Sequence, residues 1–188
     1  MRARVLVPLI TLVVAAQACC CCTIFGGPQP PYTITPSDEA VQRFEERMNS
    51  AETISDGSFT ITITEEEMTS LIIQELAEQG EPLPISEPQM HFRNGRAELY
   101  ATVQLTESLA LPGMIALSIT ATDGKVKVTV EEISFGPLPI PESIVQSLAD
   151  GFSETLAKGI QGDAVDALIT DVQIGEGEMS ISGQILSP

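Results

Sequence analysis

The sequence predicts one α+β domain in which a curved antiparallel β-meander wraps around amphipathic helices. Three observations indicate this fold class: apolar residues recur at helical spacing in three segments, they alternate with polar residues in the segments between, and two strong hairpin signals join neighbouring strands. The chain has 188 residues, of which 43% are hydrophobic and 19% charged. This length and composition suit a single folded domain with short attachments.

Two helices are expected on either side of a short strand. A serine followed by two acidic residues predicts a helix over 38–48, because the serine can cap the helix and the acids suit its dipole. Apolar residues alternate with hydroxyl residues over 58–63, which predicts a half-buried strand. Thr64 and Glu67 then have the spacing of a capping box. A second helix is therefore expected to run from there to about Gln79.

The middle of the chain has the pattern of a β-meander. Asn94-Gly95 and Asp123-Gly124 are dipeptides typical of two-residue hairpin turns, and alternating strands flank both. The alternation shifts phase at Glu131-Glu132, which predicts a β-bulge that bends the sheet. A proline-rich corner over 136–141 then precedes an expected amphipathic helix over about 142–160. A final hairpin with its turn at 175–177 ends the domain.

The N-terminus has the features of an export signal. Arg2 and Arg4 precede an apolar run over 5–16, and small residues lead to Cys19 as in a bacterial lipobox, although Ala16 stands where leucine is usual. The expected division is a lipoprotein signal peptide over 1–18, a lipidated Cys19 with a proline-rich tether over 19–36, and one domain over 37–188. The alternative is an uncleaved transmembrane anchor over 5–24. Either places the domain outside the cytoplasm, anchored to the cell membrane.

The tether is expected to pack against nothing. Four prolines between residues 23 and 36 favour an extended polyproline conformation, and 14 such residues span roughly 40 Å. The anchor is needed because a formal charge of −17 repels anionic headgroups. The same charge repels phosphate backbones, so nucleic acid is excluded as a partner.

Catalysis and cofactors are not expected. The four cysteines are consecutive, Cys19 to Cys22, and this spacing does not suit a zinc site, so no metal or other cofactor is predicted. His91 is the single histidine, and by alternation it lies opposite Met90 and Phe92, facing solvent or a sheet edge. No nucleophile elbow accompanies it, so we expect a protein that is not an enzyme.

One apolar face is predicted to carry the function. The chain has no tryptophan, and its apolar faces are mostly Met, Leu, Ile and Val, which conform to acyl chains better than to flat ligands. The basic residues Arg93, Arg96, Lys125 and Lys127 flank the two meander turns and could lie near headgroups at the mouth of a cavity; solvated turn charges are the alternative. The expected lining comprises Met68, Leu71, Ile72, Met90, Phe92, Leu99, Leu117, Val128, Leu148 and Phe152.

The order of these elements resembles a known group of proteins. The threonine-capped helix after a short strand, the Asn-Gly-Arg and Asp-Gly-Lys hairpins, the Gly-Pro-Leu-Pro-Ile-Pro corner and the closing hairpin are similar to the YpmS-like and LmeA-like exported bacterial proteins, over about residues 59–185. Those families resemble the tubular lipid-binding superfamily, which implies a TULIP-like half-barrel: a curved sheet around a long helix, with an elongated groove for phospholipid. The resemblance implies a protein that binds or transfers a phospholipid or acyl chain.

Another function class remains open. A core filled by its own side chains would leave no room for a lipid. The protein would then be a non-catalytic scaffold that acts in the envelope through its acidic surface.

Overall fold

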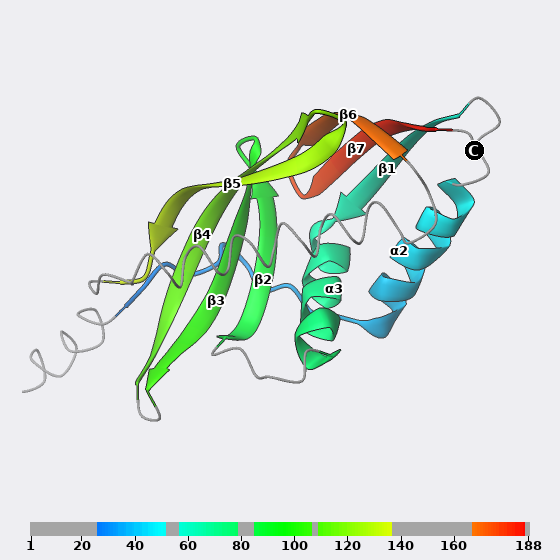
Figure 1. The fold of residues 1–188 in the computed structure, drawn as a ribbon. Helices are drawn as coiled ribbons and strands as arrows, with labels where there is room; N and C mark the ends of the chain where they lie inside the picture. Colours follow the sequence, from blue (N-terminus) through cyan, green and yellow to red (C-terminus); the bar gives the residue numbers. More distant parts are fainter. Residues whose placement is uncertain (1–25, 52–56, 79–84, 107–108, 137–166, 187–188) are drawn as a thin grey trace, which may run out of the picture.

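The computed structural model describes residues 26–51, 57–78, 85–106, 109–136 and 167–186. Two antiparallel sheets and two helices make up this part of the chain (Figure 1). The predicted α+β class is confirmed. The expected helix over 142–160, with Leu148 and Phe152, lies outside the described residues, as do the signal segment and Cys19.

The two helices begin where the sequence predicts. Helix α2 spans Asp38–Ala51, and the Ser37 hydroxyl accepts a hydrogen bond from the Ala40 amide at 3.1 Å. Helix α3 spans Glu65–Glu78 directly after strand β1, Ser58–Thr64. The capping box is confirmed, since the Thr64 amide donates to Glu67 at 3.0 Å and the Glu67 amide donates to the Thr64 hydroxyl at 3.3 Å.

Four consecutive strands form the meander. They are β2 (Ile85–Arg93), β3 (Arg96–Thr106), β4 (Leu109–Thr122) and β5 (Lys125–Ser134), in the order β2-β3-β4-β5. Both predicted turns have the left-handed backbone of hairpin loops, with φ of 53° at Asn94 and at Asp123. The predicted bulge is also confirmed, because Ala116 pairs with Glu132 while Leu117 pairs with Val130.

The closing hairpin lies in a second sheet. Strands β6 (Ala167–Ile174) and β7 (Glu178–Ile185) pair with each other, and β7 also pairs with β1, which gives the order β1-β7-β6. The two sheets meet at the meander turns, where the Ile169 amide donates to the Gly124 carbonyl and the Gly177 amide donates to the Phe92 carbonyl, each at 2.9 Å. One hydrophobic core joins the sheets with α2 and α3.

Helix α3 covers the free edge of β2. The Phe92 amide donates to the Glu65 carboxylate at 2.7 Å, and the Met90 amide donates to the Thr69 hydroxyl at 3.0 Å. Both amides point away from β3, where an edge strand would otherwise present unpaired donors. The arrangement fixes α3 beside the inner face of the meander (Figure 1).

The proline-rich segment does pack against the domain. Residues 26–36, which we call the strap, run across the outer face of the meander to α2 (Figure 1). Gly27 lies against Pro112 of β4, the Ile34 amide donates to the Gln89 side chain at 3.2 Å, and Ile34 is buried. The expectation of a tether without packing contacts is therefore wrong for residues 26–36. Extended polyproline geometry suits a chain laid along a sheet as well as a free linker.

Candidate functional site

The inner face of the meander and the adjoining face of α3 form one apolar surface. Inward apolar residues alternate along the strands with outward ones that are mostly polar, although Tyr100, Met114 and Ala116 form a small apolar cluster on the outer side. Four buried members of the core cluster lie here: Met90 at 0% exposed, Phe92 at 1%, Leu117 at 2% and Met68 at 5%. These residues form the floor of the apolar surface.

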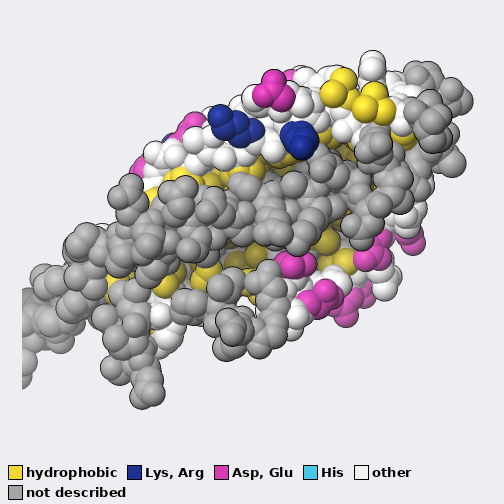
Figure 2. All heavy atoms as spheres, viewed as in Figure 1, with side chains coloured by type: hydrophobic (Ala, Val, Ile, Leu, Met, Phe, Trp, Pro, Cys, Tyr) yellow, Lys and Arg dark blue, Asp and Glu magenta, His cyan; other side chains and the backbone are white. Residues whose placement is uncertain are grey.

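Half-buried aliphatic side chains surround this floor. They pack against the core cluster and keep part of their own surface uncovered: Leu71, Ile72, Leu99, Ala121, Val126, Val128, Val130, Ile133, Val172 and Ile174. In Figure 2, hydrophobic side chains are visible on both sides of the atoms drawn in grey. Among the described residues of this surface, the half-buried ones have surface left to offer to a guest molecule.

The structure brings eight of the ten predicted lining residues into this surface. Met68, Met90, Phe92 and Leu117 lie in its floor, while Leu71, Ile72, Leu99 and Val128 are half-buried against it. Leu148 and Phe152 lie outside the described residues. Contact of the eight with a ligand stays a prediction. Val126 and Val130 were missed, although the alternation that identified Val128 includes both neighbours.

The basic residues near the turns divide into two pairs. Arg93 and Arg96 both contact the buried carboxylate of Glu98, at 2.6 Å and 3.2 Å, so they are held on the outer face. Burial alone would raise the pKa of Glu98, but the hydrogen bonds from Arg93 and Tyr100 hold it below its usual value. Lys125 and Lys127 are exposed on the edge strand β5, and neither has a carboxylate within ion-pair distance among the described residues.

The charges around the apolar surface are therefore uneven. In Figure 2, basic side chains lie on the upper rim close to hydrophobic ones, with acidic side chains beside them, and further acidic side chains gather along the lower edge toward α2 and α3. The lysines alternate along β5 with Val126 and Val128, which face inward. The β5 rim of the apolar surface thus offers cations without ion-pair partners in the described ranges, on a chain whose formal charge is −17.

His91 is buried, contrary to the sequence-based expectation. It lies opposite Met90 and Phe92 as predicted, but its side chain is 0% exposed instead of facing solvent. The ring of Tyr32 from the strap lies edge-on at 4.7 Å between centroids, and the ring of Tyr100 from β3 at 5.5 Å. The strap and the outer face of β3 enclose His91 together, and neither contact was visible in the local alternation.

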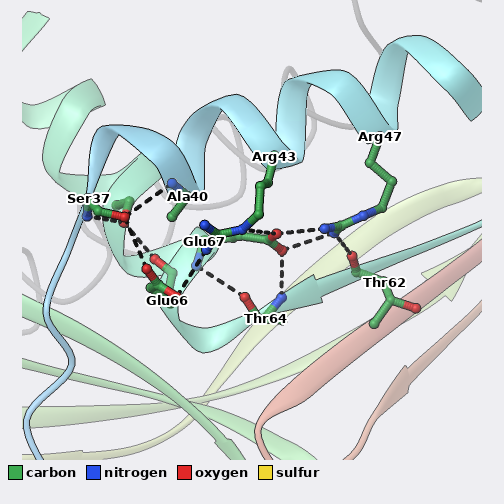
Figure 3. Close-up of polar contacts among 9 residues, drawn as sticks. Ser37, Ala40, Arg43, Arg47, Thr62, Thr64, Glu66 and Glu67 are labelled. Carbon is green, nitrogen blue, oxygen red and sulfur yellow. Dashed lines mark hydrogen bonds and ion pairs between the residues drawn. The ribbon is translucent and has the colours of Figure 1, made fainter.

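A second polar cluster joins α2, β1 and α3 (Figure 3). The Arg47 guanidinium donates to both carboxylate oxygens of Glu67, at 2.6 Å and 2.9 Å, and also to the Thr62 carbonyl. Arg43 lies one helical turn earlier and pairs with Glu66 at 3.0 Å. These groups bond to one another, so the cluster holds α2 and α3 together.

A metal site and a membrane-spanning helix are absent from the described ranges. No group of three or more His, Cys, Asp or Glu side chains there is placed to hold a metal ion. No helix in the same ranges is both long and apolar enough to cross a bilayer. The apolar surface with its basic β5 rim is therefore the candidate site.

Comparison with known proteins identifies a family with a lipid ligand. A family model described as LmeA-like phospholipid-binding matches residues 34–184, which is most of the chain. This range begins in the strap and ends in β7, so it includes both sheets and the whole apolar surface. A search of curated proteins finds no match.

Proposed function

The chain belongs to the LmeA-like phospholipid-binding family, and from this premise we propose that it binds the acyl chains of a phospholipid against the inner face of the meander. The half-buried aliphatic side chains of α3, β3 and β5 are the observation that best supports the proposal. They form a continuous apolar surface over a closely packed floor. A hydrocarbon chain placed there would cover what the protein's own core leaves partly uncovered.

The physical chemistry of such a site favours exchange. Removing an acyl methylene from water gains about 0.8 kcal/mol, whether the methylene enters a bilayer or a dry protein surface. Moving a lipid between the two is therefore nearly neutral, so loading and release are both accessible. Aliphatic side chains and Met adapt to a flexible chain, which suits a site that accepts more than one conformation of its ligand.

We further propose that the protein is exported and held at the outer surface of the cytoplasmic membrane. The sequence of the first 22 residues supports lipidation at Cys19, with an uncleaved transmembrane anchor as the alternative. An anchored domain would meet membrane lipids continuously, and it would bind them, transfer them, or both. Because the formal charge of −17 opposes binding to anionic headgroups, a covalent or spanning anchor is required.

Lipid binding is tested by native mass spectrometry of the protein extracted in mild detergent. We expect phospholipid to accompany the folded chain, and a fluorescent fatty acid to be taken up by delipidated protein and displaced by phospholipid. Val128→Asp should weaken this uptake at least tenfold, because it places a carboxylate on the apolar surface. Thermal unfolding of the variant checks that the fold survives.

Thr129→Asp provides the matched control. Thr129 is the next residue of β5 and its side chain is exposed, so the same charge there should leave uptake unchanged. Equal effects of the two variants would place the site elsewhere. Absence of copurifying lipid together with absence of uptake would favour the scaffold with a filled core.

A further inference from the structure

Among the described residues, the strap contacts the rest of the domain through Gly27, Tyr32 and Ile34, and Tyr32 lies against His91. The Tyr32 hydroxyl donates to the Glu65 carboxylate, and the Tyr32 ring lies edge-on to His91. The Glu65 hydrogen bond raises the pKa of Tyr32 to about 12, so the tyrosine stays protonated and able to donate. Ile34 is the single buried side chain of the strap. A segment with so little apolar burial can detach before the sheets unfold.

His91 is an unusual residue to find beneath such a segment. Its side chain is fully buried, and neither ring nitrogen has a hydrogen-bond partner among the described residues. The nearest charged group is Glu65 of α3, whose carboxylate lies 3.7 Å from Nδ1. A neutral imidazole tolerates this apolar enclosure between two tyrosine rings, whereas an imidazolium would have to give up its hydration.

The surrounding charges do not reverse this preference. Burial is the largest influence and lowers the pKa of His91; Arg93 on β2 lowers it further, while Glu65 on α3 and Glu98 on β3 raise it. Glu98 is already paired with Arg93 and Arg96. Glu176 lies in the turn between β6 and β7. Its charge raises the pKa of Tyr32, and its carboxylate accepts a hydrogen bond from the Asn94 amide. The net result is a histidine that is easier to protonate once the strap has left.

We propose that the strap is an acid-released latch, in which protonation of His91 favours detachment of residues 26–36 from the outer face of the meander. With the strap detached, His91 is exposed to water and regains an ordinary pKa near 6.5. The detached state then binds more protons than the latched state as the pH falls below that value. The latch is therefore fully closed above about pH 6.5 and weakens progressively below it.

Release would change how far the domain can move from the membrane. This consequence rests on the proposed anchor at the N-terminus. With the latch closed, the strap holds Gly27 against Pro112, and with the latch open the first residues that pack on the domain are those at the start of α2. The added 11 residues span roughly 35 Å in polyproline geometry. Acid would thus lengthen the connection without altering the apolar surface.

Hydrogen exchange of the full-length chain in detergent tests the latch. The amide of Ile34 donates to the Gln89 side chain of β2, so its protection reports the closed state. After correction for intrinsic exchange, protection of peptides over 32–37 should fall by up to about tenfold per pH unit below pH 6.5. Peptides from β3 and β4 should remain protected. Unchanged strap protection down to pH 5, or its loss together with that of the sheets, would overturn the proposal.

Two variants test whether His91 and Tyr32 control the protection of the strap. His91→Phe keeps an aromatic ring without a titrating group. Because His91 is the only histidine, the step, meaning the fall in strap protection between pH 6.5 and pH 5, should vanish. Tyr32→Phe keeps the ring contact but removes the bond to Glu65, so protection should fall at every pH while the step persists. Persistence of the step in His91→Phe would refute the mechanism.

Should His91→Phe not fold, tyrosine emission gives a second measurement on the otherwise native chain. The protein has no tryptophan, and its two tyrosines are Tyr32 and Tyr100, so Tyr100→Phe leaves emission from Tyr32 alone. The Tyr32 emission should change with pH at the same midpoint as the hydrogen exchange of the strap. Emission that does not change with pH would contradict release of the strap. Lipid uptake should be unaffected in every variant, which separates this proposal from the proposed function.

Discussion

Glu67 is the buried carboxylate on which the packing of α2, β1 and α3 depends. Its side chain is 1% exposed, and it accepts hydrogen bonds from Arg47 and from the Thr64 amide (Figure 3). Burial alone would raise the pKa of Glu67, but these bonds outweigh it and hold the pKa below the usual value. A charge in this position is tolerated only while its partners remain.

Removal of the Arg47 guanidinium should therefore be costly. Arg47→Met keeps the aliphatic stem but leaves Glu67 buried without its main partner, and we expect a loss of about 2–3 kcal/mol in the free energy of unfolding at pH 7. Arg43→Met, one turn earlier on the same helix face, is the control. Arg43 reaches Glu67 only at 3.8 Å and is half exposed, so its loss should be about 0.5 kcal/mol. Urea denaturation of both variants measures the difference, and equal losses would refute the assignment.

The same residue gives the stability a dependence on pH. Because the pKa of Glu67 is lower in the folded chain than in the unfolded chain, its contribution is present above the usual glutamate pKa and is lost as the pH falls through the lowered value. The penalty of Glu67→Gln should accordingly be largest near neutral pH and shrink below about pH 4. Urea denaturation across that range measures it, and a penalty independent of pH would show that the Glu67 charge is not its source.

Local and long-range contacts differ in how far the sequence predicts them. The capping bond between Thr64 and Glu67 follows from a three-residue spacing, and it is confirmed. Arg47 is 20 positions away, and no spacing rule identifies it as the partner of Glu67. His91 shows the same limit, because alternation gives its face correctly but cannot reveal that Tyr32, 59 residues earlier, covers it.

At the scale of elements, prediction works best where turn chemistry is specific. The starts of α2 and α3, the Asn94-Gly95 and Asp123-Gly124 turns and the bulge on β5 all follow from local signals and are confirmed. Two features were not predictable in this way. The strap packs on the sheet although its prolines equally suit a free linker, and the pairing of β7 with β1 joins segments more than 110 residues apart.

Strand β5 carries different side chains on its two faces. Val126, Val128 and Val130 face the apolar surface, and the exposed Lys125 and Lys127 lie between them on the opposite side of the same edge strand. A lysine stem is long enough to bring its ammonium group to the rim while its Cβ points outward. We propose that these two ammonium groups attract the phosphate of a lipid bound on the inner face.

Lys125→Gln with Lys127→Gln tests this assignment. Each exposed ion pair contributes about 0.2–1 kcal/mol, so the double variant should bind phosphatidylglycerol about 2–30-fold more weakly at low salt. Binding of diacylglycerol, which has the same chains but no phosphate, should be unchanged. At about 0.5 M salt the difference should largely disappear, because screening weakens exposed pairs first. An equal loss for both lipids would mean that the lysines act through the fold.

At the scale of the whole molecule, the strap connects the proposed site to the proposed anchor. It begins beside Pro112 and Gly136 at one end of the meander and crosses to α2 near the other end (Figure 1). The first described residues of the strap therefore lie at the end of the meander where β5 finishes. We propose that an anchor joined to the chain there holds that end of the apolar surface toward the bilayer.

The identity of the anchor is the last prediction. If Cys19 is lipidated, the mature chain should begin at Cys19 with the added mass of a diacylglycerol thioether, and it should enter the detergent phase on phase separation. Cys19→Ala should abolish that mass, whereas Cys20→Ala, one position later, should leave it unchanged. A transmembrane anchor predicts the opposite result: an intact N-terminus and membrane retention in both variants. Intact mass spectrometry of the three proteins distinguishes the two, and release of all three into the aqueous phase would exclude any membrane anchor.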